Sequence, residues 1–293
     1  MRSQGLNIKS EGPKLAIIGH QAPGGAMHAV RSPAVAGLFY PRDPRALRAQ
    51  IQGFLADVTT PLPPPKALIA PHAGYVYSGA VAASAYATIQ ALRQQTTRVI
   101  LLGPAHRVFV RGFGASSAAF FETPLGQVHV DQSVIQSLVT DLPFVDYVDD
   151  AHSEEHSLEV QIPFLQETLD AFTLVPLVAG DASTEQVEAV LERLWGGPET
   201  LIVISSDLSH YHDYTTAKRI DRATTQAIER LEPAQITDVR ACGRVPVRGL
   251  LTIAKRYGLS VHTVDVRNSG DTAGPRDRVV GYGAYLFYAD NGL

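Results

Sequence analysis

Three short, uninterrupted runs of apolar residues constrain this chain more than any other feature of its sequence. They span residues 66–70, 98–102 and 201–204, and segments of helical character follow the first and third runs, near 78–93 and 213–231. Strands that helices cover on both faces are apolar throughout, whereas half-exposed strands alternate between apolar and polar residues. The pattern therefore predicts an α/β fold: three layers, α/β/α, around a mostly parallel, mixed central sheet.

The segments outside these runs extend the same arrangement. Asp43 and Pro44 indicate that a helix begins there and covers 44–56, because Asp is a favoured N-cap and Pro a favoured first helical residue. Residues 279–288 alternate Tyr with apolar residues, so we expect an edge-like or antiparallel strand. Other strands are expected at 127–130, 173–178 and 261–266, and other helices at 132–141, 158–171, 184–194 and 247–257. Nothing resembles a linker, and residues 29–293 are expected to form one domain.

Composition and charge exclude several classes of protein. Hydrophobic residues make up 45% of the 293 residues and charged residues 18%, which suits a globular chain with a sizeable core. The net charge is −4 and no dense run of Lys and Arg occurs, so no nucleic-acid partner is expected. Cys242 is the sole cysteine, which excludes an internal disulfide and a zinc site built of several thiolates.

The sequence predicts a cytoplasmic protein without a membrane partner. No stretch reaches the roughly 18 uninterrupted apolar residues of a membrane helix, and no apolar stretch of secretory length follows the N-terminus. Residues 1–28 are rich in Gly, Ser and Gln, and Met27 stands just before the first organised segment. We interpret residues 1–28 as a disordered extension or as the product of a misassigned start, with Met27 in place of Met1 as the natural start.

Polar side chains that can bind a metal follow each of the three apolar runs. His72 follows the first run, His106 the second, and the pair Asp207 and His210 the third. In open α/β sheets, ligand sites lie beyond the carboxyl ends of the strands. Singly, each residue could be a turn residue or a helix cap. Together, three strand ends that carry imidazole are hard to attribute to packing, because buried polar groups cost free energy unless they are paired. The sequence therefore predicts one shared metal site.

Cys242 is a further candidate ligand. It stands just before a predicted helix and two residues before Arg244, and both features favour a thiolate. Thiolate together with imidazole suits Fe, Cu or Zn and does not suit Mg or Ca. The alternative interpretation is a small buried hydrophobic residue, as most free cysteines are. From the residues alone, both interpretations stay open.

Residues 151–159 form the densest polar cluster of the chain. His152, His156 and Glu159 would share a face if this segment were helical. The spacing is that of metalloprotease helices with two His, but the Glu beside the first His is missing. A helix-capping segment in which Ser157 is the N-cap and the acids are solvated explains about half of the residues. His156 and Glu159 remain candidates for catalytic acid/base roles or for contacts that orient the ligands.

Taken together, these stretches resemble the Memo family, whose prokaryotic members are often called AmmeMemoRadiSam system protein B. The resemblance covers about residue 29 to the C-terminus. Its motifs are VRSPAVAGLFYP (30–41), APHAGY (70–75), GPAH (103–106), EHSLE (155–159), SSDLSH (205–210), ACG (241–243) and the end strand 279–288. Several motifs that match in order make the resemblance specific.

The resemblance implies a fold similar to that of class III extradiol dioxygenases, which are non-haem iron enzymes. It places the family's metal pocket on His72, His106, Asp207, His210 and Cys242. It also implies iron or copper binding, redox chemistry, recognition of phosphorylated peptides by animal members and, by family naming, a radical SAM protein as partner. Extradiol dioxygenases use two His and one carboxylate, so a thiol in the pocket argues against catechol cleavage.

Three functional hypotheses follow. In the first, the chain is a metal-dependent oxidoreductase that acts on an unidentified small molecule or peptide. Fe(II) is then the expected cofactor, with Cu or Zn as alternatives, and Asp207 and His210 complete its coordination or act as acid and base. In the second, the chain is a module without activity that binds a peptide or ligand, or sequesters metal. In the third, it is a metal-assisted hydrolase.

Overall fold

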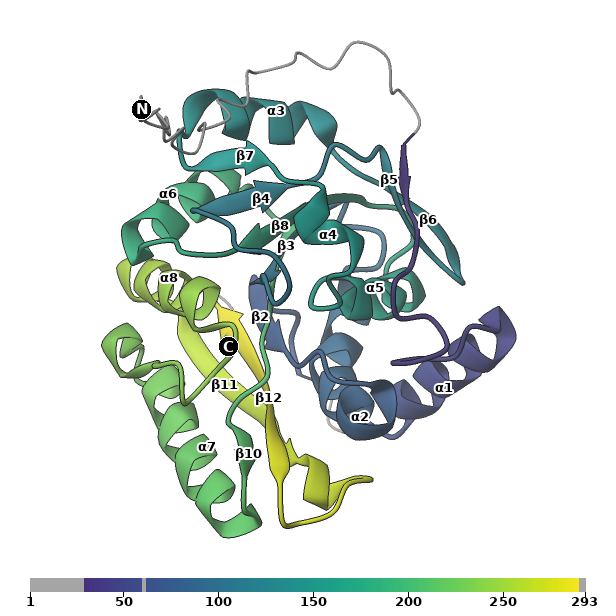
Figure 1. Cartoon of the computed structure of the whole chain (residues 1–293), viewed down its shortest axis with the longest axis vertical. Coiled ribbons are helices and arrows are strands. Elements are labelled where there is room, and N and C mark those ends of the chain that lie inside the picture. Colours follow the sequence, from purple (N-terminus) through teal and green to yellow (C-terminus); the bar gives the residue numbers. More distant parts are fainter. Residues whose placement is uncertain (1–28, 60–61, 290–293) are drawn as a thin grey trace, which may run out of the picture.

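The computed structural model describes residues 29–59 and 62–289 of the chain (Figure 1). The expectations for residues 1–28 and for Met27 as the start concern residues outside this part. No helix of the described part combines the length and the apolar character that crossing a membrane requires. The assignment of 29–293 to one domain stays a prediction.

A mixed sheet is the centre of the fold. Within the described residues it has nine strands: β2 (Ala67–Ala70), β3 (Arg98–Pro104), β4 (Phe113–Ala115), β7 (Val145–Tyr147), β8 (Thr173–Ala179), β9 (Thr200–Ser205), β10 (His210–His212), β11 (Ser260–Asn268) and β12 (Val279–Tyr288). Their order is β10-β12-β2-β9-β3-β8-β4-β7, and β11 pairs with β12. The four central strands β2, β9, β3 and β8 are parallel, and β12 is antiparallel to β2. The predicted sheet is confirmed, including an antiparallel β12.

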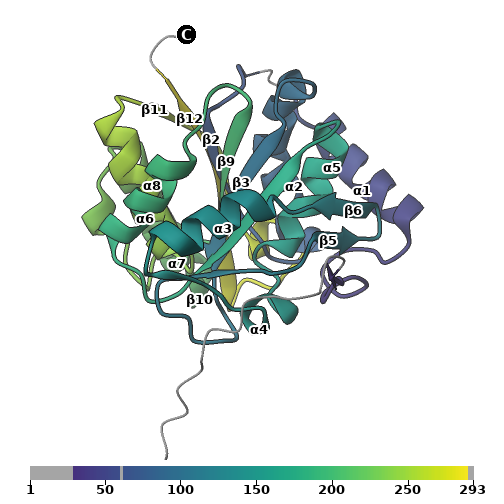
Figure 2. The same ribbon diagram turned by 90° about the horizontal axis from the view of Figure 1, so that it is seen from above.

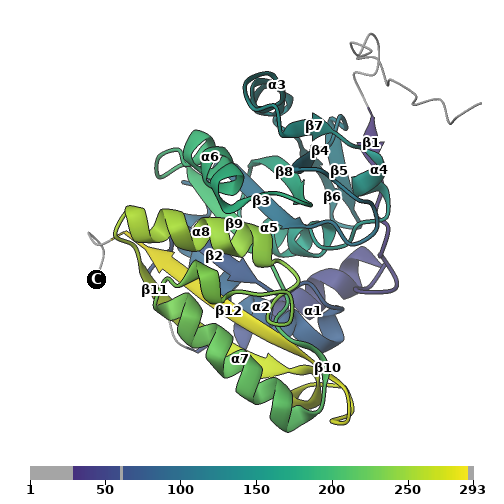
Figure 3. The same ribbon diagram turned by 60° about the vertical axis from the view of Figure 1, so that its left-hand side comes forward.

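Helices cover both faces of this sheet, which confirms the predicted α/β/α layers (Figures 2 and 3). On one face lie α6 (Thr184–Leu194), α7 (Tyr214–Glu229) and α8 (Arg244–Arg256). On the other face α2 (Tyr75–Tyr86) packs against the strands, and α1 (Pro44–Ala56) and α5 (Ile162–Thr168) pack against α2. Helix α3 (Gln132–Asp141) lies beside β7 and β8.

Local chemistry explains where several of these helices begin and which side they bury. The Asp43 carboxylate accepts a hydrogen bond from the Ala46 N–H at 2.8 Å, and Leu47, Ile51 and Leu55 are the buried stripe of α1. Side-chain caps also open α3, α6 and α7. Side chains of the central strands are buried on both faces, as the apolar runs predicted.

The structure differs from the predicted elements mainly near residues 150–170. In place of one helix over 158–171, a short α4 (Asp150–Ser153) precedes a turn, a 3₁₀ turn η2 (Glu159–Gln161) and the seven-residue α5. The Ser157 hydroxyl donates to the Pro104 carbonyl at 2.8 Å, so it does not cap a helix. The structure also contains a small separate sheet of β1 (Val30–Arg31), β5 (Phe120–Thr123) and β6 (Gly126–His129). Of these three strands, only β6 was predicted.

Candidate metal centre

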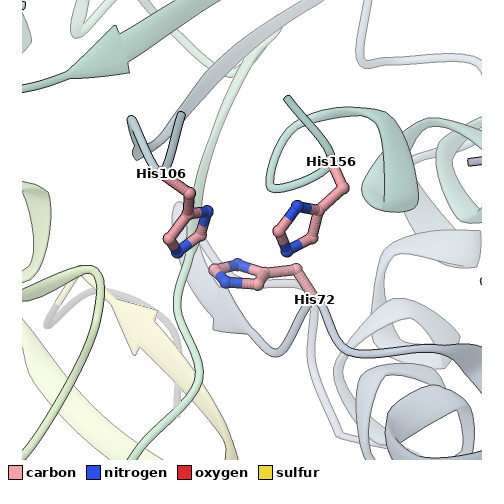
Figure 4. A group of neighbouring side chains, drawn as sticks. All are labelled: His72, His106 and His156. Carbon is pink, nitrogen blue, oxygen red and sulfur yellow. The ribbon is translucent and has the colours of Figure 1, made fainter. Parts of the chain in front are cut away.

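Three imidazoles converge beyond the carboxyl ends of β2 and β3. His72 follows β2, His106 follows β3, and His156 comes from the turn between α4 and η2. One ring nitrogen from each of the three histidines lies within 4.8 Å of those of the other two (Figure 4). Neutral imidazole nitrogen is the commonest protein ligand of transition metals. The arrangement can therefore hold one metal ion.

The three rings differ in their access to solvent. The side chain of His72 is 2% exposed, whereas those of His106 and His156 are 28% and 18% exposed. The rings of His106 and His156 stack with an interplanar angle of 12°, and the His72 ring meets both of them edge-on. The candidate centre thus opens to solvent on the side of His106 and His156 and is closed at His72.

A hydroxyl group sets the tautomer of His72. The Ser205 hydroxyl donates to the Ser157 carbonyl at 2.5 Å and accepts from the Gln161 side-chain amide at 2.8 Å. Its proton is therefore committed, so its 2.8 Å contact with His72 Nδ1 requires that Nδ1 carry the hydrogen. The lone pair of His72 then lies on Nε2, as metal binding requires.

Glu155 orients the other two imidazoles. One of its oxygens lies 2.9 Å from His106 Nδ1 and also accepts the N–H groups of His156 and Ser157, at 2.9 and 2.8 Å. The other oxygen accepts the His106 N–H at 2.6 Å. The same carboxylate lies 3.4 Å from His156 Nδ1. With both Nδ1 atoms turned to Glu155, the Nε2 atoms of His106 and His156 remain for a metal.

The electrostatics of the cluster favour neutral rings at His72 and His156 and a charged carboxylate at Glu155. Burial lowers the pKa of His72 well below its ordinary value, and neighbouring imidazoles lower it further. Burial also lowers the pKa of His156. Burial acts to raise the pKa of Glu155, but the hydrogen bonds and the charge of His106 outweigh it and bring the pKa to about 2. Neutral rings are the form that binds a metal.

Cys242 and Asp207 lie beside His72. The Cys242 Sγ is 3.3 Å from His72 Nε2, and an Asp207 oxygen is 4.0 Å from the same nitrogen. The other Asp207 oxygen accepts the His72 N–H at 2.8 Å. Burial raises the pKa of Asp207, and burial followed by the Asp207 charge raises that of Cys242. Arg244 pairs with Asp238. Without a metal the sulfur is therefore a thiol, contrary to the expectation that Arg244 and the helix would favour thiolate.

Two glycines permit these close approaches. A Cβ at Gly243 would lie 2.6 Å from the Ser206 Cβ and 2.8 Å from the Ser205 carbonyl oxygen. A Cβ at Gly103 would lie 2.9 Å from side-chain atoms of Ser157 and Leu158. Glycine at these positions lets the Cys242 turn and the His156 turn pack against the ends of β9 and β3.

Glu159, a predicted acid/base residue, bonds to residues 31–40 and to none of the three imidazoles. Its buried carboxylate pairs with Arg31, accepts the Tyr40 hydroxyl at 2.5 Å and accepts the N–H groups of Ala34 and Val35 at 2.8 and 3.0 Å. Arg31 also donates to the Glu155 carbonyl at 2.6 Å. These bonds fasten the 30–40 segment to the turn that carries His156. A catalytic role for Glu159 stays a prediction.

The structure thus brings together most, though not all, of the predicted residues. His72, His106, Cys242 and Asp207 are neighbours. His210 starts β10, its Nδ1 bonds the Leu208 carbonyl at 2.8 Å, and it lies outside the group of three imidazoles found in the described chain. His156, expected in a supporting role, takes that third place. The ligand assignments of His210, Cys242 and Asp207 stay predictions.

Two features escaped the sequence analysis. The alternative in which the acids of residues 151–159 are solvated is wrong for Glu155, which is 2% exposed, bonds the His106 ring and accepts the His156 backbone N–H. His152 lies apart from the cluster, where its Nε2 contacts the Gly114 carbonyl at 3.0 Å. The position of Glu155 directly before His156 was the only sequence signal, and it did not separate this acid from its exposed neighbour Glu154.

The residues present fit a transition metal. Bonds from imidazole nitrogen to such ions are about 2.1 Å long, so two nitrogens on one ion are at most about 4.2 Å apart. The spread of up to 4.8 Å among the three nitrogens closes to that with a small inward shift of the rings. Nitrogen and sulfur donors favour Fe, Cu or Zn over Mg or Ca.

Comparison with known proteins agrees with the motifs. The model of the Memo-like protein family matches residues 31–286. A MEMO1 family protein of Saccharolobus solfataricus is 35% identical over 285 residues, which cover 88% of this chain and 99% of that protein. A MEMO1 family protein of Sulfolobus acidocaldarius is 37% identical over 283 residues, covering 86% and 97%.

Among solved structures, the uncharacterized protein JW3007 of Escherichia coli K12 aligns with a TM-score of 0.45 at 14% identity, over 75% of this chain and 98% of that one. The match of the family's model over nearly the whole described chain, together with relatives above 30% identity, settles the resemblance first seen in the motifs. The chain belongs to the Memo family.

Proposed function

We propose that this chain is an iron(II)-dependent oxidoreductase whose metal is held by His72, His106 and His156. The convergence of the three imidazoles within 4.8 Å is the observation that carries the proposal. The half-buried thiol of Cys242 beside His72 supports it, because nitrogen and sulfur donors suit a redox-active ion. Copper and zinc are the alternative ions.

When bound, the iron would supply one-electron chemistry with dioxygen as the oxidant. The protein's own residues prepare the site for it. Ser205 holds the proton of His72 on Nδ1, and Glu155 holds that of His106 on Nδ1, so that both rings aim Nε2 inward. Cys242 would join as a fourth ligand after losing its proton, or would remain a thiol that donates to the Asp207 carbonyl.

Asp207 is the group best suited to move a proton at the site. It is 4% exposed, and burial raises its pKa toward the range in which it can exchange a proton. His210 is the second acid/base residue of this proposal. Its Nδ1 bonds the Leu208 carbonyl, so its Nε2 is left to take up or release a proton. The substrate is a small molecule or a peptide that enters from the exposed side of His106 and His156. A radical SAM protein is the proposed partner, by family naming alone.

A second function is favoured by one specific observation. Three imidazoles and a thiol together supply four donors, and a four-donor set can close around an ion and leave no position for substrate. Such a site would sequester metal. It would bind iron or copper tightly and show no turnover.

Elemental analysis of anaerobically purified protein tests the metal site. We expect about one iron per chain in the wild type and loss of iron in His72→Ala and in His156→Ala. His129→Ala is the matched control, because His129 is an exposed residue of β6. Full iron occupancy in both cluster variants would show that the assignment is wrong.

Two further measurements separate the functions. Cys242→Ser should lower iron affinity if the sulfur is a ligand and should leave it unchanged if the thiol only packs. Oxygen consumption by iron-loaded protein with a panel of thiols, phenols and peptides tests for an oxidase. Stoichiometric iron without oxygen uptake would favour sequestration, and zinc occupancy with ester turnover would favour a hydrolase.

A further inference from the structure

Strand β11 forms an outer edge of the central sheet. In the described part of the chain it pairs with β12 alone, along eight positions. Residues 260–267 of β11 are half-buried or exposed, whereas strands β2 and β9 are buried throughout, and Val266 is 37% exposed. Helices α7 and α2 flank β11 on its two faces (Figure 3). Its outer side therefore presents backbone to solvent.

The register shows which backbone groups point outward. Gly281 of β12 exchanges hydrogen bonds with Leu208 and Ser209, both 2.8 Å long, on the side away from β11. Direction alternates along a strand, so Gly283 and Tyr285 also point away from β11.

The residues of β11 opposite Gly283 and Tyr285 therefore form no backbone hydrogen bonds with β12. Val266 is opposite Gly283 and Thr263 is opposite Tyr285, so both direct their N–H and C=O groups to the outer side. Asn268, opposite Gly281, supports this: its N–H donates outward to the Asp271 carboxylate at 3.1 Å.

Cavities lie on both faces of this edge. A cavity of about 560 Å³ lies between α7 and β11, and Val266 and Asn268 are in its wall. Another of about 430 Å³ lies on the opposite face, where His262 and Asp265 meet the side of α1 and α2. A strand added to β11 would point alternate side chains into the two cavities, which is how edge-strand docking obtains specificity.

The two cavities differ in chemistry. Lys218, Arg219 and Arg222 are exposed on α7 at the first cavity, and among the described residues none of them forms an ion pair with a carboxylate. The acidic residues of that wall accept hydrogen bonds from within the chain: Asp221, Glu229 and Asp271. The second cavity has the apolar side chains of Phe54 and Val58 in its wall together with the carboxylates of Asp57 and Asp265, which repel acidic side chains, so this cavity suits apolar ones. Its complement alternates acidic with apolar residues.

We propose that the outer edge of β11 is a docking site for an extended segment of a partner protein. The segment adds as a strand, with its backbone bonded to Thr263 and Val266. Its acidic side chains enter the α7 cavity and its apolar side chains enter the cavity beside α1. This site is separate from the metal centre, and the inference does not depend on the proposed function.

A synthetic peptide of ten residues, alternating valine and glutamate, is the probe. Its binding to the full chain is measured by fluorescence anisotropy. Val266→Pro removes one outward N–H, and an edge strand tolerates proline where that N–H faces solvent. Val266→Ala is the matched control, because it shortens the side chain and keeps the N–H. Arg222→Glu tests the charge, with Arg45→Glu, an exposed change outside both cavities, as its control.

We expect saturable binding that weakens at least about tenfold in Val266→Pro and in Arg222→Glu and changes little in the two controls. The same peptide with alternate backbone nitrogens methylated should not bind wild-type protein, and this arm holds even if Val266→Pro does not fold. Equal binding of the methylated peptide, or no saturation by about 1 mM, overturns the proposal. A dimer of the free protein that Val266→Pro dissociates would assign the edge to a second copy and would also overturn it.

Discussion

Replacement of Glu155 by glutamine tests whether one carboxylate organises the candidate metal centre. Glu155 accepts four N–H groups: those of the His106 backbone and ring and of the backbones of His156 and Ser157. Three of them meet one oxygen, and the fourth meets the other. In glutamine one of the two oxygens becomes an NH₂ group, which cannot accept a hydrogen bond. If the remaining oxygen keeps the three N–H groups, the NH₂ group faces the His106 backbone N–H, so at least one donor loses its acceptor.

The magnitude follows from this count. One unsatisfied buried N–H costs about 1–3 kcal/mol, and the remaining bonds lose their charge assistance. We therefore expect Glu155→Gln to lower the free energy of unfolding by about 2–4 kcal/mol. Loss of a group that orients metal-binding His typically weakens metal affinity about 10–100-fold.

The assay is iron(II) affinity by competition with a chelator, together with urea unfolding of the metal-free protein. Glu154→Gln is the control, because Glu154 is the adjacent, exposed acid and the substitution is chemically identical. Metal affinity and stability of Glu155→Gln that match those of Glu154→Gln would refute the assigned role of Glu155.

Three further predictions concern residues around the centre. Burial lowers the pKa of His152 from 6.5 to about 4, so between these pH values only the unfolded chain gains a proton at this residue. The free energy of unfolding should therefore fall by about 3 kcal/mol as the pH drops from 6.5 to about 4. Urea unfolding at several pH values measures this slope, and His152→Gln should flatten it. Gly243→Ala should displace Cys242 and destabilise the fold by about 1–3 kcal/mol, and unchanged melting with unchanged thiol accessibility would contradict the close approach. Arg31→Met should cost about 3–5 kcal/mol by leaving Glu159 buried and unpaired, whereas the double change with Glu159→Leu should recover part of it.

Long and regular patterns carried the fold prediction. The apolar runs that became β2, β3 and β9 and the periodic segments that became α3 and α6 were located to within about two residues at each end. Strands β4, β5 and β7 were missed, since strands of three or four residues are too short to show a period. The segment after 150 was misjudged because its structure is set by contacts with Arg31 and Pro104, which lie far away in the sequence.

The site divides in the same way. His72 and His106 were predictable because each lies two residues after a strand, and β2 and β3, both parallel to β9 between them, end at the same edge of the sheet. His156 reaches them from a turn, and nothing in its local sequence fixes where that turn lies. The fate of Glu155 depends on burial, which one-dimensional spacing does not report.

The hydrogen bonds behind His72 also restrict where protons can travel. Tyr86 donates to Gln161, Gln161 donates to the Pro71 carbonyl and to Ser205, and Ser205 donates to a carbonyl, so each hydrogen in this chain is already assigned. A Grotthuss-type relay needs groups that can both release and accept, and the fixed carbonyl acceptors at the end of this chain cannot pass a proton on. Protons released at the proposed site would therefore have no route along this chain of hydrogen bonds, whereas the partly exposed rings of His106 and His156 lie on the side that reaches solvent.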